Sequence, residues 1–327
     1  MKLKTIGLIS ILALGLMVAS IPVEAQESKK VYRIGYLVPR TALKPRDKAF
    51  LQGLRDLGYV AGKNLIVESR LGTRKQLPKL AAELVDLNVD VIVAPGTPPA
   101  KAAKTATKTI PIVFAVIADP VGAGFVNSLA RPGGNITGLT PSSAELSGKR
   151  LELLKEIIPS VTRVAVLSTP DYPLPLKTEA LKEMEAAARA LGVRLQLVEV
   201  RGRNDFGRAF SAVSRGRAEA LTVLPVPMFR AEQKRIINFA AKNRLPTVFH
   251  WKPYVEAGGL MSYGPDGVAM YRRAASYVDK LLKGAKPADL PVERARDFEL
   301  VINLKTAKQL GITIPPSIRY RADKVIK

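Results

Sequence analysis

The stretch Val31-Tyr-Arg-Ile-Gly-Tyr-Leu37 decides the fold, because its pattern returns as Val161-Thr-Arg-Val-Ala-Val-Leu167 at an offset of 130 residues. Repetition in a fixed order predicts two copies of one structural unit. Four further pairs follow in that order: Leu57-Gly58 with Leu191-Gly192, Val91-Ile-Val-Ala-Pro95 with Leu221-Thr-Val-Leu-Pro225, Ile110-Pro-Ile-Val-Phe114 with Leu245-Pro-Thr-Val-Phe249, and Gly133-Gly134 with Gly258-Gly259.

Within each half, short apolar runs alternate with segments whose apolar residues follow helical spacing. Runs such as Val91–Ala94 lack the alternation of a half-exposed strand, as expected for strands covered on both faces of a parallel sheet. Alternating strands and helices favour parallel βαβ units. We therefore predict an α/β fold of two doubly wound parallel-sheet lobes joined by a three-segment hinge.

The expected strands are 31–38, 64–70, 90–94, 111–116, 135–139, 162–168, 193–200, 219–224, 246–249, 259–262 and 298–304. The expected helices are 45–57, 77–87, 98–107, 122–130, 148–157, 175–191, 205–215, 230–243, 266–283 and 305–310.

The repeat also sets the domain boundaries. We expect lobe one to comprise residues 31–139 and 266–290, and lobe two to comprise residues 142–263 and 291–327. By symmetry, the helix at 266–283 should pack back on lobe one. Ligands of open α/β sheets lie at the carboxyl ends of the strands, so two such sheets predict a cleft lined by matching loops of both lobes.

The composition narrows the function classes. With 47% hydrophobic and 24% charged residues, the chain has the profile of a soluble globular protein. It has no Cys, which excludes thiolate metal sites and cysteine nucleophiles, and one His, His250, which excludes a zinc site built from several histidines. Gly122-Ala-Gly124 lacks the third glycine of a dinucleotide-binding loop. We expect no metal and no cofactor, and nothing in the sequence requires an enzyme.

The N-terminus predicts export. Lys2 and Lys4 precede an apolar run from Ile6 to Val18, and the segment ends in Val23-Glu-Ala25. This layout is typical of a secretory signal peptide over residues 1–25, cleaved after Ala25. An uncleaved anchor is the alternative, although the run is short for a bilayer of about 30 Å. We expect a periplasmic protein that is not attached to lipid, because no cysteine lies near the cleavage site.

Two loops of lobe one are candidates for ligand contact, together with Thr41 in the loop after the first strand. Gly96 permits a tight turn, Thr97 is a good N-cap, and Pro98 suits the first position of a helix. The start of that helix favours an anion such as a carboxylate, although a purely structural cap is equally open. Asp119 ends a strand, where it either neutralises a ligand ammonium or caps the helix expected at 122–130.

The matching loops of lobe two gather aromatic and polar residues at strand ends. The candidates there are Asp171, Tyr172, Met228, His250, Trp251 and, at the second crossing between lobes, Tyr263. Trp251 and Tyr254 offer flat apolar walls and His250 a polar tip. Core packing or support of the loops is the alternative for each of them.

Four stretches of the chain are characteristic: Phe50-Leu-Gln-Gly-Leu-Arg-Asp-Leu-Gly-Tyr-Val-Ala-Gly-Lys-Asn64, Ala118-Asp-Pro-Val-Gly-Ala-Gly124, Leu129-Ala-Arg-Pro-Gly-Gly-Asn-Ile-Thr-Gly138 and Gly148-Lys-Arg-Leu-Glu-Leu-Leu-Lys155. They resemble the family of ABC-transporter substrate-binding proteins that includes tryptophan/tyrosine-type binding components, and the match runs from about Tyr32 to Ile318. The resemblance implies a type I periplasmic-binding fold, delivery of a small solute to a membrane permease, and ligand contacts at Thr97 and Asp119. Some relatives are lipoproteins, and the lack of cysteine here points to a Gram-negative periplasm.

We therefore expect the substrate-binding component of an ABC importer. It would bind an amino acid or a similar small carboxylated solute between the lobes and close around it. Its partners would be that solute and the transmembrane permease subunits, with membrane contact only through the permease, and the protein itself would be a monomer. A two-lobed glycosyl-transferring enzyme and a ligand-sensing module are the alternative functions.

The strong basic character has three readings. Lys and Arg number 51 against 28 Asp and Glu, a formal net charge of +23. The excess is a solvated face, a surface that attracts acidic ligands or anionic lipid, or a nucleic-acid site. Repressor cores share the two-lobed fold but begin with a helix-turn-helix, where this chain has the secretory pattern, so we expect no nucleic-acid partner. One candidate for the solvated face is the cluster Arg201, Arg203, Arg208, Arg215 and Arg217.

Overall fold

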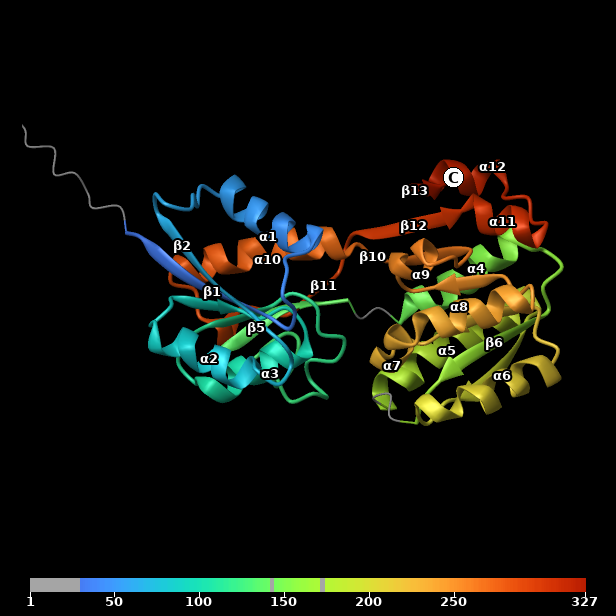
Figure 1. Ribbon diagram of the computed structural model, residues 1–327, viewed down its shortest axis with the longest axis horizontal. Coiled ribbons are helices and arrows are strands. Elements are labelled where there is room, and N and C mark those ends of the chain that lie inside the picture. The colour runs from blue at the N-terminus through green and yellow to red at the C-terminus, as the bar shows by residue number, and fades with distance from the viewer. Residues whose placement is uncertain (1–29, 142–143, 171–173) are drawn as a thin grey trace, which may run out of the picture. The chain divides into compact units, whose positions relative to one another are not determined.

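The structure is a computed structural model that describes residues 30–141, 144–170 and 174–327 (Figure 1). Its first sheet has the strand order β11-β5-β4-β3-β1-β2. These strands are β1 (Tyr32–Val38), β2 (Leu65–Leu71), β3 (Val91–Val93), β4 (Ile112–Phe114), β5 (Ile136–Thr140) and β11 (Glu293–Arg294), and every pairing among them is parallel.

The second sheet has the order β13-β12-β10-β9-β8-β6-β7. Its strands are β6 (Arg163–Ser168), β7 (Arg194–Glu199), β8 (Ala220–Val223), β9 (Thr247–Phe249), β10 (Met261–Pro265), β12 (Phe298–Asn303) and β13 (Lys324–Ile326). Only the β10–β12 pair is antiparallel.

The predicted duplication is confirmed by the order of the strands. The order β2-β1-β3-β4-β5 of the first sheet returns in the second as β7-β6-β8-β9-β10. The register differs by one residue, since Ile34 pairs with Val91 in one sheet, whereas Val164 pairs with Ala220 and not with Leu221 in the other. The chain passes between the sheets three times: after β5, after β10 and after β11. The α/β class with two doubly wound lobes is thus confirmed.

Helices cover both faces of the first sheet. In lobe one, α1 (Pro45–Asp56) packs beside α10 (Gly267–Leu282), and α2 (Leu77–Asp86) packs beside α3 (Thr97–Ala106) on the other face (Figure 1). Apolar side chains of α1 and α10 share one core with β1, among them Phe50, Tyr271 and Ile34. The helix that follows β10 therefore returns to lobe one, as the repeat predicts.

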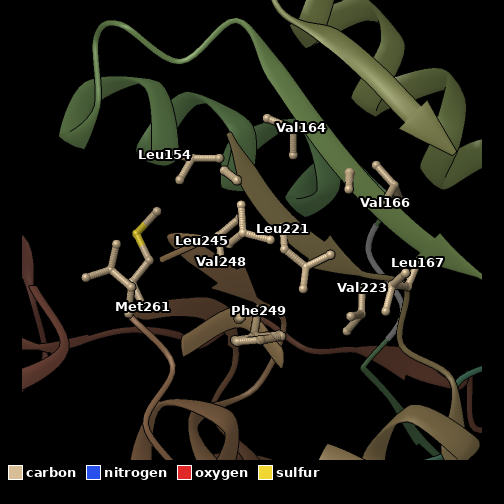
Figure 2. Close-up of a cluster of buried hydrophobic side chains, with 14 of the residues drawn as sticks. Leu154, Val164, Val166, Leu167, Leu221, Val223, Leu245, Val248, Phe249 and Met261 are labelled. Atoms are coloured by element: carbon tan, nitrogen blue, oxygen red, sulfur yellow. The ribbon is translucent and has the colours of Figure 1, made fainter. Parts of the chain in front are cut away.

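Lobe two has one large apolar core, part of which Figure 2 shows. Val166, Leu221 and Val248 contribute to it from three neighbouring strands, and Leu154 contributes from α4 (Glu145–Ile157). The remaining helices of the described chain are α5 (Leu174–Leu191), η1 (Arg203–Asp205), α6 (Phe206–Arg215), α7 (Pro227–Ala231), α8 (Gln233–Lys242), α9 (Lys252–Glu256), η2 (Pro287–Asp289), α11 (Leu304–Leu310) and α12 (Pro316–Arg321).

The two exchanged helices need glycine at their crossings. A Cβ on Gly53 of α1 would lie 2.8 Å from the Arg272 carbonyl oxygen of α10, and one on Gly148 of α4 would lie 3.1 Å from the Glu183 carbonyl oxygen of α5. Each glycine lets two helix backbones approach closely. The same device thus fastens α10 to lobe one and α4 to lobe two.

Several predicted elements differ in the structure. The helix expected at 122–130 is absent, and turns stand in its place because Gly124 takes a left-handed φ of 68° and the amides of Gly124 and Phe125 bond back to Val121 and Pro120. The helix expected at 230–243 is two helices, α7 and α8. The first sheet also includes β11. Lobe one therefore extends past residue 290, where its second segment was expected to end.

The predicted signal peptide, residues 1–25, lies outside the described residues. Within the part of the chain that the structure does describe, no helix combines the length and apolar character that spanning a bilayer requires.

Candidate functional site

The loop after β1 is built around one buried carboxylate. Asp47, at the third position of α1, is fully buried and accepts hydrogen bonds from the Tyr36 hydroxyl and the Lys44 amide. The Arg40 guanidinium also forms an ion pair with it. Burial beside this carboxylate raises the pKa of Tyr36 well above its ordinary range. Both oxygens of Asp47 are therefore occupied, and its role is to hold the loop.

A second arginine stands at the same helix start without a carboxylate. The Arg46 guanidinium lies over the ring of Tyr271 of α10, 5.1 Å from its centroid, and its buried Nε has no hydrogen-bond partner. Tyr271 is itself buried. Cations are disfavoured at a helix N-terminus, so this position does not serve the stability of α1.

The loops after β3 and β4 correct two predictions. Thr97 is not the N-cap of α3: Gly96 holds that position with φ of 101°, Thr97 begins the helix and is exposed, and the half-buried Pro98 follows. Asp119 accepts a hydrogen bond of 2.8 Å from the Gly122 amide. It caps a turn and not a helix at 122–130, and its contact with a ligand ammonium stays a prediction.

In lobe two, polar side chains stand at the ends of two strands. The register pairs Leu167 with Val223 and Thr222 with Val248, so Ser168 at the end of β6 and His250 after β9 reach the same edge of the sheet, two strands apart. Ser168 Oγ and His250 Nδ1 are buried and have no hydrogen-bond partner. A buried polar atom without a partner is costly and needs an explanation.

The His250 imidazole is held neutral. Desolvation, followed by the charges of Arg150 and Arg230, lowers its pKa to about 3, and a hydrogen bond to the Val223 backbone opposes this effect. Since Nδ1 has no partner, Nε2 makes that bond, and a neutral ring that donates through Nε2 keeps an acceptor at Nδ1. His250 therefore offers a bare acceptor to a hydroxyl or N–H group.

Aromatic rings surround this acceptor. Tyr254 of α9 is buried, stacks on Phe249 at 4.4 Å and meets the His250 ring edge at 5.6 Å, and its hydroxyl has no partner. Trp251 is half-buried, and the guanidinium of Arg230 lies 3.9 Å from its ring centroid. The indole face expected to be an open wall is thus covered by Arg230.

The two sets of loops influence each other electrostatically. Desolvation, followed by the charge of Arg46, lowers the pKa of Arg230 to about 10. Desolvation also lowers the pKa of Lys44, and Arg46, Arg40 and Arg230 add to that effect. Arg230 follows β8 of the second sheet, whereas the other three follow β1 of the first. The loops of the two lobes therefore lie within electrostatic range of each other.

The remaining predicted residues are spread out. Thr41 is exposed, and Met228 is half-buried against the core of lobe two. Tyr263 of β10 accepts a hydrogen bond of 3.2 Å from Arg150 at its carbonyl oxygen, and its side chain borders a polar cavity of about 800 Å³ beside β12. That cavity contains none of the other predicted residues. Asp171 and Tyr172 lie outside the described residues.

The predicted ligand contacts do not include Ser168, Arg46, Arg230 or Tyr271. Ser168 had a detectable signal, because the 130-residue offset matches it with Val38, and a polar residue replaces an apolar one at the end of a buried strand. The two arginines had none, since they are two of 51 basic residues. In the described part of the chain, no three His, Asp or Glu side chains are arranged to hold a metal ion.

Comparisons with known proteins agree with this architecture. The family model of the ABC transporter substrate binding proteins matches residues 34–326. A tyrosine-binding protein of Clostridioides difficile strain R20291 is 29% identical over 295 residues, which cover 88% of this chain and 83% of that protein. The members of this family are substrate-binding proteins and not enzymes.

Solved structures give the same result. A domain from Streptococcus pneumonia in complex with L-Trp is 27% identical, with a TM-score of 0.75 over 91% of this chain and 100% of that chain. A conserved domain protein from Vibrio cholerae is 32% identical, with a TM-score of 0.73 over 91% of this chain and 99% of that chain. The two lobes are structurally similar to type I periplasmic binding proteins.

Proposed function

Because this chain belongs to the ABC transporter substrate-binding protein family, we propose that it binds a small, partly apolar carboxylated solute between its lobes and delivers it to a membrane permease. The proposal places the solute against the loops that follow β1, β8 and β9. Ligands of open α/β sheets bind at this end of the strands.

The observation that carries the proposal is the set of buried polar atoms without partners in lobe two. Ser168 Oγ lies at the end of β6, His250 Nδ1 directly follows β9, and the Tyr254 hydroxyl belongs to α9, the helix after β9. Each such atom costs about 1–3 kcal/mol while it remains unsatisfied. A bound solute that hydrogen-bonds to them supplies the missing partners.

The relatives suggest which solutes to test. One relative is named for tyrosine and another was solved with L-Trp, so aromatic carboxylates come first. A solute that touches both lobes would favour the closed arrangement by its differential affinity for it. Closure would then present the loaded protein to the permease.

Export to the periplasm and a monomeric state belong to the same proposal. Cleavage after Ala25 would leave Gln26 as the first residue. Mass spectrometry of the exported protein checks this, because a retained leader would give the full-length mass.

Calorimetry with aromatic amino acids and aromatic hydroxy acids tests the proposal. We expect at least one compound to bind more tightly than about millimolar, and His250→Leu to weaken that binding at least about tenfold. Arg208→Gln is the control, because Arg208 is exposed and its ion-pair partner among the residues that the structure describes is Asp205. Scattering should show a more compact particle with solute. Absence of binding throughout the panel contradicts the proposal.

A further inference from the structure

We propose, on the basis of the proposed function, that the solute is an organic anion without an ammonium group, held by Arg46 of lobe one and Arg230 of lobe two. The amino acids named for the relatives are zwitterions with no net charge. The chemistry of these loops favours a ligand of a different class.

The charge of the loop after β1 is one-sided. Arg40, Lys44 and Arg46 stand within seven residues at the start of α1, and Asp47 is the only carboxylate among them. Asp47 already binds Arg40, Tyr36 and the Lys44 amide. Arg46 therefore keeps its full charge, and the loop as a whole is positive.

Arg46 and Arg230 share an arrangement that leaves their hydrogen-bonding edges for a ligand. Each guanidinium lies over an aromatic ring, Tyr271 for Arg46 and Trp251 for Arg230, at 5.1 and 3.9 Å from the centroids. Neither forms an ion pair with any residue that the structure describes. Stacking orients the planar fork, which matches the geometry of a carboxylate.

An ammonium group finds no unpaired acceptor among the described carboxylates of the loops after β1 and β8. Asp47 is saturated, and Glu232 pairs with Arg203 at 3.0 Å. Asp119 follows β4, outside these loops, and accepts the Gly122 amide through Oδ1 alone. Glu299 of β12, which lies beyond the loops, pairs with Lys252 at 3.1 Å. A zwitterion would bring its positively charged ammonium group toward the guanidinium groups of Arg46 and Arg230, whereas an anion without ammonium would not.

The same charges make closure depend on the ligand. Arg46 and Arg230 belong to different lobes, and their like charges repel as the loops approach. An anion between them turns this repulsion into two attractive contacts. Empty protein is thereby held open, and the anionic solute is selected because it alone offsets the charge that opposes closure.

Matched pairs of compounds test this inference. L-Phe is compared with 3-phenyllactate, L-Tyr with 3-(4-hydroxyphenyl)lactate, and L-Trp with indole-3-lactate, so that only the ammonium changes to a hydroxyl. We expect the hydroxy acid of the preferred pair to bind at least about tenfold more tightly. Its affinity should also fall as the ionic strength rises.

Variants of both arginines complete the test. Arg46→Gln and Arg230→Gln should each weaken binding of the hydroxy acid at least about tenfold, and Arg46→Lys should restore only part of it because lysine lacks the fork. Arg208→Gln, the control of equal charge change, should bind normally, and thermal unfolding of every variant confirms that it is folded.

The outcomes separate the two proposals. Tighter binding of the amino acids overturns the anion inference and leaves the proposed function standing. Tighter binding of the hydroxy acids that is insensitive to Arg46→Gln and Arg230→Gln overturns the assignment of these two residues. Absence of binding by every compound contradicts the proposed function itself.

Discussion

The two lobes share a strand order but differ where matching strands end. The offsets of the repeat match Val38 with Ser168 and Ala115 with His250. Val38 and Ala115 are buried in the apolar core of lobe one, whereas Ser168 and His250 each bury a polar atom without a partner. Lobe one demonstrates that this fold does not need polar groups at these positions. Their presence in lobe two is therefore best explained by a ligand.

Features that the lobes do share belong to the fold. Gly138 of β5 and Gly264 of β10 occupy matching last strands, and a Cβ would lie 1.9 Å from the Phe114 carbonyl oxygen in the first case and 2.0 Å from the His250 carbonyl oxygen in the second. Both positions admit only glycine without movement of a neighbouring strand. The comparison thus separates residues kept for folding from residues kept for binding.

The largest expected effect tests the shared feature. Gly138→Ala and Gly264→Ala should each lower the free energy of unfolding by about 4 kcal/mol or more, because the new methyl group meets a backbone oxygen. Denaturant unfolding measures the loss. Gly207→Ala is the control, since nothing lies within 4 Å of a Cβ there and alanine suits the helix. Equal stability of all three variants would contradict this reading.

A smaller loss is expected where a polar group of lobe one is fully satisfied. Asp47→Ala should cost about 3–5 kcal/mol, because it leaves the Arg40 charge and the Tyr36 hydroxyl without their buried partner. Asp56→Ala, on the same helix, should cost far less, because its ion pair with Arg272 is exposed. Thermal or urea unfolding of the two variants compares them. Similar losses would refute the structural role of Asp47.

His250 should make the stability of lobe two depend on pH, whereas the matching residue of lobe one, Ala115, does not titrate. Burial lowers its pKa to about 3, so the unfolded chain binds more protons between about pH 6.5 and 3. Stability is full above about pH 6.5 and falls on acidification, by at most about 1.4 kcal/mol per pH unit from this residue. The difference between wild type and His250→Gln isolates the effect, because the chain has no other histidine. A flat difference between pH 6.5 and 4 would disprove it.

The smallest effect on stability should accompany a large effect on binding. Tyr254→Phe removes a buried hydroxyl that has no partner, so the variant should be unchanged or up to about 1 kcal/mol more stable, yet bind its solute more weakly. Tyr59→Phe is the control: its hydroxyl donates to Asp279 at 2.9 Å, so the variant should lose about 1 kcal/mol and bind normally. Loss of stability in Tyr254→Phe would mean that the hydroxyl serves the fold.

The secondary structure of this protein could be predicted from its sequence in large part. Buried parallel strands are continuous apolar runs, so most strands were placed within one or two residues, although the short β11 was not predicted. The helix expected at 122–130 was wrong because Phe125 and Val126 are buried from turns, which apolar spacing cannot tell from a helix. No element was predicted beyond residue 310, so α12, which Pro316 opens, and β13 were missed.

The candidate site could be predicted only in part. The position of His250 and Trp251 at a strand end indicated them, because the loop follows directly from the strand pattern. Arg46 and Arg230 depend on which side chains lie over Tyr271 and Trp251, and such contacts between distant segments leave no trace in spacing or composition. Thr97 was misplaced by one residue, because glycine takes the cap when a left-handed φ is needed before the helix.

A crystal structure of the protein with its tightest-binding hydroxy acid is the most direct test of the claim that the unsatisfied groups of lobe two exist for a solute. We predict a carboxylate between Arg46 and Arg230, and a polar atom of the solute about 3 Å from His250 Nδ1. Solute bound to one lobe alone, or in the cavity beside Tyr263 and Asp297, would contradict it.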